Sequence, residues 1–171
     1  MVVEIDEATG ATPTWTSVTS CTFGGSDADD STTAVATPTS TGTNFSFVKT
    51  FSVNITTTNS LSMTNILFGK TAAESVTGTK FWQSVAHSSY TQATAAPTAT
   101  SDNNVTAPTI NSATATAVSL ITAPPSAYAA GPFTTTGRHG NMVEVAVGVD
   151  STNSSAGSQS IGTFRFSWTE S

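Results

Sequence analysis

The chain has 171 residues, a formal net charge of −6 at pH 7 and 9% charged residues, where a typical soluble protein has roughly 25%. Its five Lys and Arg residues are too few for the clustered basic surface that binds nucleic acid or an anionic membrane. The length suits one domain, residues 1–171, and nine Phe and three Trp residues favour a packed core over a disordered chain.

Cysteine usage and the first residues bear on where the protein is made. Cys21 is the single cysteine, which excludes an internal disulfide, and we expect it to be a small buried residue. The opening MVVEIDEATG carries acids and lacks the apolar core of a signal peptide. We therefore expect a chain that is made and used without export, or one that has been trimmed.

Period-two alternation of apolar and polar residues predicts strands along much of the chain. Residues 2–8 alternate in this way and predict a short strand that ends at Thr9-Gly10. Residues 15–23 are rich in β-forming residues but alternate only loosely. Residues 24–31, GGSDADDS, predict an acidic loop, and residues 34–42 predict an extended connection.

Residues 44–56, NFSFVKTFSVNIT, form the densest apolar row in the protein and predict its central strand. The residues of one parity, which we expect in the interior, are Phe45, Phe47, Phe51, Val53 and Ile55. Lys49 falls in the same row, and burying its charge without a partner would be costly. We expect Lys49 to extend to the rim or to pair with a carboxylate such as Glu144 or Glu4.

The next segment, residues 61–68, predicts a strand with Leu61, Met63 and Asn65 on one face, paired in a hairpin with residues 44–56. Residues 71–87 predict the one short helical segment, because Thr71 and Glu74 fit a capping box and residues 81, 82 and 85 share a helical face. Gly78 interrupts this segment, so we expect only short turns.

Residues 91–119 are rich in Thr, Ala, Ser, Pro and Asn, and predict a long extended loop or arm that orders only against a partner. Residues 118–121 predict a return to a strand, and residues 136–141, TGRHGN, predict a tight turn.

The C-terminal part predicts two more strands joined by a long loop into a hairpin. In residues 142–149 the alternation places four valines inside and Glu144, Ala146 and Gly148 outside. In residues 161–169 the aromatic side chains face one way.

Seven to nine strands without a β-α-β rhythm predict an all-β fold, an antiparallel β-sandwich of the jelly-roll type. The residues that we expect to form the core or to support assembly are Phe45, Phe47, Phe51, Val53, Val143, Val145, Val147, Phe164, Phe166 and Trp168.

Residue patterns typical of catalysis or metal binding do not emerge from the sequence. His87 and His139 lack ligand spacing, and no GxSxG motif is present. Residues 27–31, DADDS, lack the glycine and the distal glutamate of an EF-hand, which favours a solvated loop. The sequence therefore assigns no catalytic, cofactor-binding or metal-binding residue. Four aromatic residues could form either core or a sugar-binding platform: Trp15, Trp82, Tyr90 and Tyr128.

Four short motifs resemble a group of small β-rich proteins of tailed-bacteriophage particles. They are Glu7-Ala8-Thr9-Gly10 in the first strand, Phe45-Ser46-Phe47-Val48-Lys49 in the central strand, Thr64-Asn65, and the acidic Glu170 at the end of the last strand. The resemblance covers both ends and the first half of the chain, but not residues 91–135. It departs at Val48, where that group has an aromatic residue before the lysine.

The resemblance implies a structural virion protein without enzyme activity, located in the virion after synthesis in the bacterial cytoplasm. A capsid decoration (cement) protein is the first expectation, and a neck or tail connector subunit is an alternative. The implied partners are the major capsid protein or other virion subunits, with a dimer or trimer of the chain itself, no cofactor, no nucleic acid and no membrane. A carbohydrate-binding or adhesin module remains an alternative of a different class.

Overall fold

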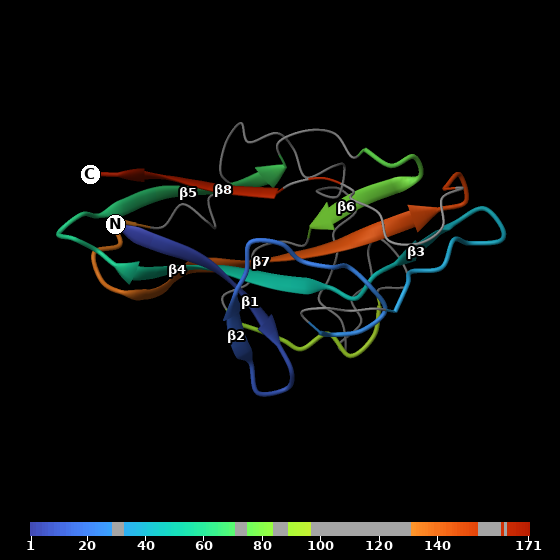
Figure 1. Cartoon of the computed structure of the whole chain (residues 1–171), viewed down its shortest axis with the longest axis horizontal. Helices are drawn as coiled ribbons and strands as arrows, with labels where there is room; N and C mark the ends of the chain where they lie inside the picture. Colours follow the sequence, from blue (N-terminus) through green and yellow to red (C-terminus); the bar gives the residue numbers. More distant parts are fainter. Residues whose placement is uncertain (29–32, 71–74, 84–88, 97–130, 154–161, 163) are drawn as a thin grey trace.

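The computed structural model describes residues 1–28, 33–70, 75–83, 89–96, 131–153, 162 and 164–171. Antiparallel strands form two sheets, and the described residues contain no helix (Figure 1). The all-β, antiparallel part of the prediction is therefore confirmed. In chain order the strands are β1 (Val2–Thr9), β2 (Thr14–Ser17), β3 (Thr43–Phe45), β4 (Lys49–Thr57), β5 (Met63–Lys70), β6 (Thr79–Gln83), β7 (Gly137–Asp150) and β8 (Phe164–Glu170).

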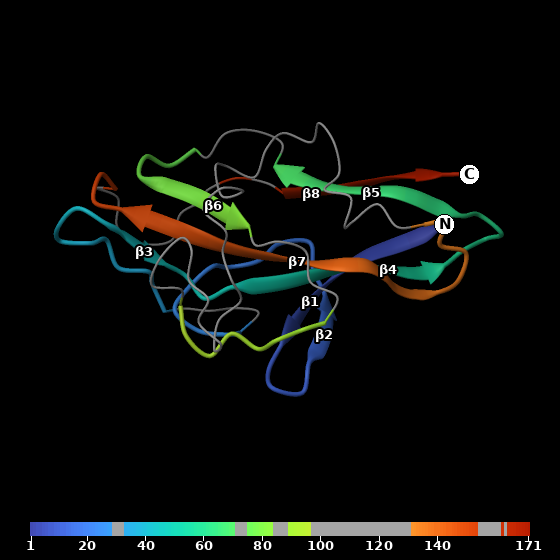
Figure 2. The same cartoon turned by 180° about the vertical axis from the view of Figure 1, so that it is seen from behind.

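The larger sheet is built around β4 and β7, as Figure 2 shows from behind. Strand β4 pairs with β1 on one edge and with β7 on the other, and β2 extends the sheet beyond β1. Strand β6 pairs with residues 145–149 of β7. Strands β3 and β4 must then share the opposite edge of β7, because β3 pairs with residues 148–150 of the same stretch.

Strands β3 and β4 together correspond to the predicted central strand, which a bulge at residues 46–48 interrupts. The Ser46 backbone N–H donates to the Val147 carbonyl at 2.9 Å, and the Val147 N–H donates to Ser46 Oγ at 2.9 Å. Beyond the bulge the side chains change sides, since Phe45 lies opposite Gly148 but Phe51 lies opposite Val143. The prediction of one continuous phenylalanine row is wrong, because Phe45 and Phe51 lie on opposite faces of the sheet.

One face of the large sheet is apolar, and we call it the apolar face. Its buried cluster consists of Phe51, Phe68, Phe81, Val143, Val145, Val147 and Val149. A second buried cluster on this face joins Val53 and Ile55 of β4 to Met63 and Ile66 of β5. The predicted inward valines and Val53 are therefore confirmed as buried. Phe166 and Trp168 of β8 are half-buried and pack against these clusters, while the Phe164 side chain lies outside the described residues.

The opposite face of the large sheet, which we call the polar face, is also covered. Glu144 and Ala146 were expected outside, but their exposed fractions are 1% and 0%, so that prediction is wrong. Ala146 packs against Val48 and Ala93, with the half-buried Phe47 beside them. Residues 89–96 therefore cover part of this face, and the sheet is buried on both sides. The rest of the predicted arm, residues 97–119, lies outside the described residues.

Neither predicted hairpin forms. Strand β5 pairs with β8, so residues 44–56 do not pair with 61–68, and β7 does not pair with the last strand. Both edges of β4 are already occupied by β1 and β7, which leaves no edge for β5. Asn59 and Ser60 adopt positive φ values of 49° and 61°, and this turn leads the chain from one sheet to the other.

A second irregularity corrects the predicted face of β5. Asn65 has a φ of +52° within a register shift between Thr64 and Leu67. Ile66 and Phe68 are consequently buried after the shift, whereas Asn65 is exposed. The two ends of the chain lie at the same end of the fold, where the N-terminal ammonium lies 3.5 Å from the Glu170 carboxylate (Figure 1).

The described part of the predicted helical segment is a turn followed by a strand. Thr79 and Phe81 are buried on alternate positions of β6, and Phe81 lies opposite Val147. Gly78 has a φ of +73°, and a Cβ there would come within 2.4 Å of the Asn153 backbone nitrogen. This close approach fixes a turn at Gly78, where the predicted segment was expected to be interrupted, but residues 79–83 that follow form a strand and not a helical turn. Residues 71–74 and 84–88 lie outside the described residues.

Candidate functional site

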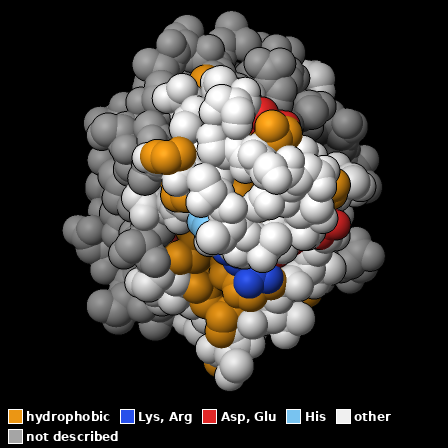
Figure 3. All heavy atoms as spheres, turned by 90° about the vertical axis from the view of Figure 1, so that its left-hand side faces the viewer, with side chains coloured by type: hydrophobic (Ala, Val, Ile, Leu, Met, Phe, Trp, Pro, Cys, Tyr) orange, Lys and Arg blue, Asp and Glu red, His pale blue; other side chains and the backbone are white. Residues whose placement is uncertain are grey.

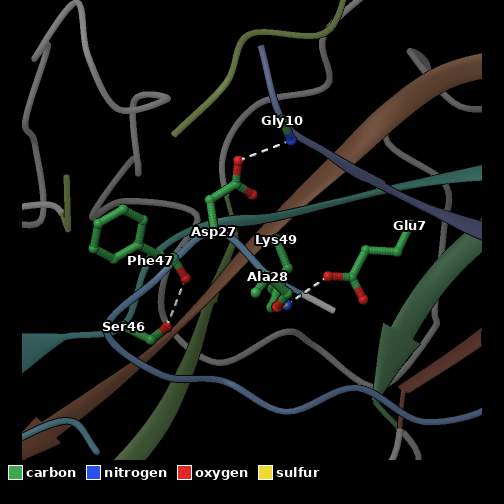
Figure 4. A network of polar contacts seen from close by, with 7 residues as sticks. All are labelled: Glu7, Gly10, Asp27, Ala28, Ser46, Phe47 and Lys49. Atoms are coloured by element: carbon green, nitrogen blue, oxygen red, sulfur yellow. Dashed lines mark hydrogen bonds and ion pairs between the residues drawn. The ribbon is translucent and has the colours of Figure 1, made fainter. Parts of the chain in front are cut away.

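The apolar face contains one buried ion pair, between Lys49 of β4 and Glu7 of β1 (Figure 4). Lys49 Nζ lies 2.5 Å from Glu7 Oε1, and the exposed fractions of the two side chains are 1% and 0%. Lys49 Nζ also donates a hydrogen bond to the Ala28 carbonyl. The ammonium therefore has two oxygen partners, which offsets part of the cost of removing its charge from water.

Strand register explains why Lys49 pairs with Glu7 and not with the expected Glu4 or Glu144. Glu7 lies opposite Phe51, two residues along β4 from Lys49, and so shares its face. Glu4 lies opposite Asn54, and Glu144 lies opposite Thr50, which places both on the polar face. Pairing with a carboxylate is thus confirmed, but the expected partners are wrong.

Cys21 lies beside this ion pair and packs against the apolar cluster. Burial raises the pKa of its thiol to about 12, the Glu7 carboxylate adds to the increase, and Lys49 opposes it. The thiol is consequently protonated at neutral pH, whereas a nucleophilic cysteine needs a lowered pKa. With the ion pair sealed and the thiol protonated, this group of residues is suited to holding strands together.

Asp27, expected in a solvated acidic loop, binds the protein itself. Its Oδ2 accepts a hydrogen bond from the Gly10 backbone N–H at 3.0 Å (Figure 4). The same oxygen accepts a second hydrogen bond from Gln92 Nε2, also at 3.0 Å. Gly10 has a φ of +81°, which favours glycine at this turn. Asp27 therefore connects the end of β1 to the segment that covers the polar face. Asp29 and Asp30 lie outside the described residues, and the described residues hold no cluster of three or more potential metal ligands.

The polar face carries the second candidate group, which we call the Arg138 cluster: Asp6, Asn54, Arg138, Trp15 and Tyr90. Asp6 is 3% exposed, and its Oδ2 accepts hydrogen bonds from Asn54 Nδ2 at 3.0 Å and from Arg138 Nη2 at 2.9 Å. The Arg138 guanidinium lies over the Trp15 ring, 4.4 Å from its centroid. A carboxylate and an aromatic ring thus fix the guanidinium in one position.

Tyr90 completes the Arg138 cluster from the covering segment. Its ring meets Trp15 edge to face, with centroids 6.2 Å apart. Burial raises the pKa of Tyr90 to about 12, and the carboxylates of Asp27, Glu144 and Glu7 contribute to the increase. Trp15 and Tyr90 were two of the four aromatic residues predicted to form core or a platform. The structure brings Trp15 and Tyr90 together. The Trp82 side chain and Tyr128 lie outside the described residues.

His139 lies in β7, not in the predicted tight turn, because residues 137–139 pair with β4. Its ring stacks on Phe133 with centroids 4.8 Å apart, and Nε2 lies 2.7 Å from the Thr135 carbonyl oxygen. His139 is thus engaged with its neighbours. His87 lies outside the described residues.

An open hollow lies next to β3, at the end of the large sheet away from the Arg138 cluster. Its lining is Gly25, Ala34, Val35, Ala36, Thr43, Asn44, Phe45 and Ala96. These residues are apolar or neutral, and they offer no acid, base or nucleophile to a substrate. Sequence reasoning missed both the Arg138 cluster and this hollow, since each depends on residues distant in the chain.

No family model, curated protein or solved structure matches the chain. Within the described residues there is no helix long and apolar enough to cross a bilayer.

Proposed function

We propose that the chain is a structural virion protein, of the capsid decoration type, which binds neighbouring subunits of a tailed-bacteriophage particle. Its finer architecture is that of a β-sandwich, in which β5 and β8 cover the apolar face of the large sheet. The sequence resemblance and the contacts of the residues that carry it support this proposal.

The motif residues behind the resemblance form structural contacts. Glu7 of the first motif and Lys49 of the second form the buried ion pair at 2.5 Å. Ser46 forms the bulge against Val147, and Asn65 has the positive φ of the β5 irregularity. Motifs that meet in this way specify a scaffold and require no catalytic chemistry, which suits a structural subunit.

The observation that carries the proposal is the outer edge of β1 near the N-terminus. Strand β2 covers Asp6–Thr9 only, and the last contact beyond it is the hydrogen bond from the Val18 N–H to the Ile5 carbonyl at 2.8 Å. Alternation of the backbone then directs the N–H and C=O of Val3 toward the same edge. No described strand pairs there, so this edge can accept a strand from a neighbouring subunit.

The surface around this edge is suited to contacts between neutral partners. Val2 has an exposed fraction of 48% and is the one exposed large hydrophobic residue in the described part of the chain. Figure 3 shows a surface made mostly of uncharged polar side chains and backbone, with few acidic or basic groups. A charge-poor surface avoids the cost of removing charges from water when subunits pack together.

A substitution at Val3 tests the role of this edge. The probe is a preparation of particles from the virus that encodes the chain, prepared without it, and the readout is co-sedimentation with the purified chain. Val3→Pro removes the outward N–H, while the bonds between β1 and β4 use the alternate residues. Wild type is expected to co-sediment and Val3→Pro to lose most binding, with Val3→Thr as the control that keeps the N–H.

Loss of binding in Val3→Pro counts only if its thermal unfolding midpoint matches that of Val3→Thr. Failure of the wild-type chain to sediment with the particles contradicts the proposed function. Equal binding by wild type and a folded Val3→Pro variant contradicts the role of the β1 edge.

A further inference from the structure

The Arg138 cluster has the features of a binding site that the scaffold does not need. Arg138 has an exposed fraction of 39%, while its anchor Asp6 is almost fully buried at 4%. A buried carboxylate that accepts two hydrogen bonds and an aromatic ring beneath the guanidinium both restrict its motion. An arginine that only keeps its charged end in water needs neither a buried carboxylate partner nor an aromatic ring beneath it.

The guanidinium retains hydrogen-bonding capacity toward solvent. It has five N–H donors in a planar fork, and the contact with Asp6 is made by Nη2. Such a fork matches the two oxygens of a carboxylate. Because its geometry is already fixed, little rotamer freedom remains to be lost when a ligand binds.

The size and neighbours of the cluster favour a sugar over a protein partner. Its three outer groups pack against one another, with Trp15 4.4 Å from the Arg138 guanidinium and 6.2 Å from the Tyr90 ring, measured to the ring centroids, so they form one compact patch that suits a small ligand. A stable protein interface instead buries about 800 Å² on each partner around apolar anchors. Ser17 of the adjacent β2 is exposed and lies opposite Asp6, so its hydroxyl group is on the same face as the cluster.

We propose that the Arg138 cluster binds a carboxylate-bearing saccharide residue, such as a hexuronic acid. Arg138 binds the carboxylate, the rings of Trp15 and Tyr90 contact the C–H groups of the sugar, and the Ser17 hydroxyl binds one of its hydroxyl groups. Asp6 and Asn54 are positioning residues that hold the arginine. The end of the molecule in Figure 3 shows hydrophobic side chains beside a basic one, the combination that such a ligand requires.

The protein's overall charge argues against nonspecific binding of an acidic sugar. A net charge of −6 disfavours nonspecific binding of anions. An acidic sugar that binds must therefore be held by local contacts, and those contacts can be removed one at a time. The Arg138 cluster does not include the β1 edge at residues 2–4, so the saccharide site and the proposed function can be tested separately.

An NMR titration of the indole N–H signals tests the site, because the chain has three Trp residues and one lies in the cluster. The probes are a galacturonate trisaccharide, the neutral galactose trisaccharide and a short poly-glutamate peptide. The acidic sugar is expected to shift the Trp15 signal, and the neutral sugar to bind at least about tenfold more weakly. The Trp168 signal is the internal control, because its indole donates to Glu170 at 3.0 Å near the C-terminus.

Two substitutions separate geometry from charge. Arg138→Gln is expected to weaken binding of the acidic sugar by about tenfold or more, and Arg138→Lys to restore only part of it, because lysine lacks the planar fork. Trp168→Phe is the matched control and is expected to bind like wild type. Both Arg138 variants must be fully folded at the temperature of the titration, as their unfolding curves show, and Asn54→Ala provides a second, milder test in a positioning residue.

Three outcomes overturn the proposal: no shift of Trp15 with the acidic sugar, equal binding of the neutral sugar, or unchanged binding in Arg138→Gln. A shift of Trp15 by poly-glutamate without one by the sugar assigns the site to an acidic peptide and also overturns it.

Discussion

The two faces of the large sheet are both buried, but they are built from different chemistry. The apolar face packs valines of β7 and phenylalanines from three strands against the second sheet, with one sealed ion pair at Lys49. The polar face buries Asp6, Thr50, Ser52 and Glu144, and its ion pair reaches solvent through Arg138. The difference indicates that the apolar face supplies most of the stability, whereas the polar face keeps one charged group, Arg138, in contact with solvent.

The largest expected effect on stability comes from breaking the ion pair on the apolar face. Lys49→Met leaves Glu7 charged in the interior and is expected to lower the free energy of unfolding by about 3–5 kcal/mol. Arg138→Met also leaves a buried carboxylate, Asp6, but Asp6 keeps its hydrogen bond from Asn54 and the lost guanidinium was half-exposed, so the expected cost is smaller, about 1–2 kcal/mol. Urea unfolding followed by tryptophan fluorescence measures both. Equal losses would contradict the distinction between the faces.

The double variant Lys49→Met, Glu7→Leu sharpens the same test. Replacing both charges with apolar side chains of similar size is expected to recover most of the stability lost in Lys49→Met. If the double variant is as unstable as the single one, the pair does more than neutralise two buried charges.

The same deletion on each face is expected to have a smaller effect. Val145→Ala removes two methyl groups from the large cluster and is expected to cost about 2 kcal/mol. Val48→Ala makes the same change in the small cluster with Ala93 and Ala146, and is expected to cost about 1 kcal/mol. Chemical denaturation again provides the comparison, and a larger loss at Val48 would reverse the assignment of stability to the apolar face.

Stability at alkaline pH gives a further comparison, because each face contributes one titrating group. Since the pKa of Cys21 is raised from 9.0 to about 12, its contribution is complete below pH 9 and is lost as the pH rises toward 12. Tyr90 behaves in the same way between pH 10.0 and about 12. Cys21→Ala is therefore expected to flatten the decline from pH 9 upward, and Tyr90→Phe only above pH 10.

Unfolding measured from pH 8 to pH 11 distinguishes these two contributions, with the wild-type protein at each pH as the reference. A Cys21→Ala curve that runs parallel to wild type throughout this range would show that the thiol is not held in its protonated form by the fold.

The sequence predicted which residues form strands better than it predicted how the strands pair. The valines of β7 and the apolar residues of β4 follow the period-two pattern, since burial alone decides their faces. The hairpins were wrong because pairing depends on which strand edges remain available, and β4 uses both of its edges for β1 and β7. Local alternation contains no information about that competition.

The backbone irregularities could not be predicted from the alternation of apolar and polar residues, for a related reason. The bulge at Ser46 depends on a side-chain hydrogen bond with Val147, 101 residues later in the chain, and it moves Phe45 to the other face. Lys49 drew attention as a charge in an apolar row, but its partner Glu7 follows from strand register. The Arg138 cluster gave no local signal, because its five members come from five separate segments of the chain.

We propose that this chain is a particle subunit that uses one buried face for stability and its β1 edge for contact with a neighbour. A cryo-electron microscopy map of particles of a bacteriophage whose genome encodes the chain provides the decisive test. We predict a fixed number of copies on the particle, each with the β1 edge at residues 2–4 paired with a neighbouring subunit. Particles that contain no copy of the chain, or copies whose β1 edge faces solvent, would contradict it.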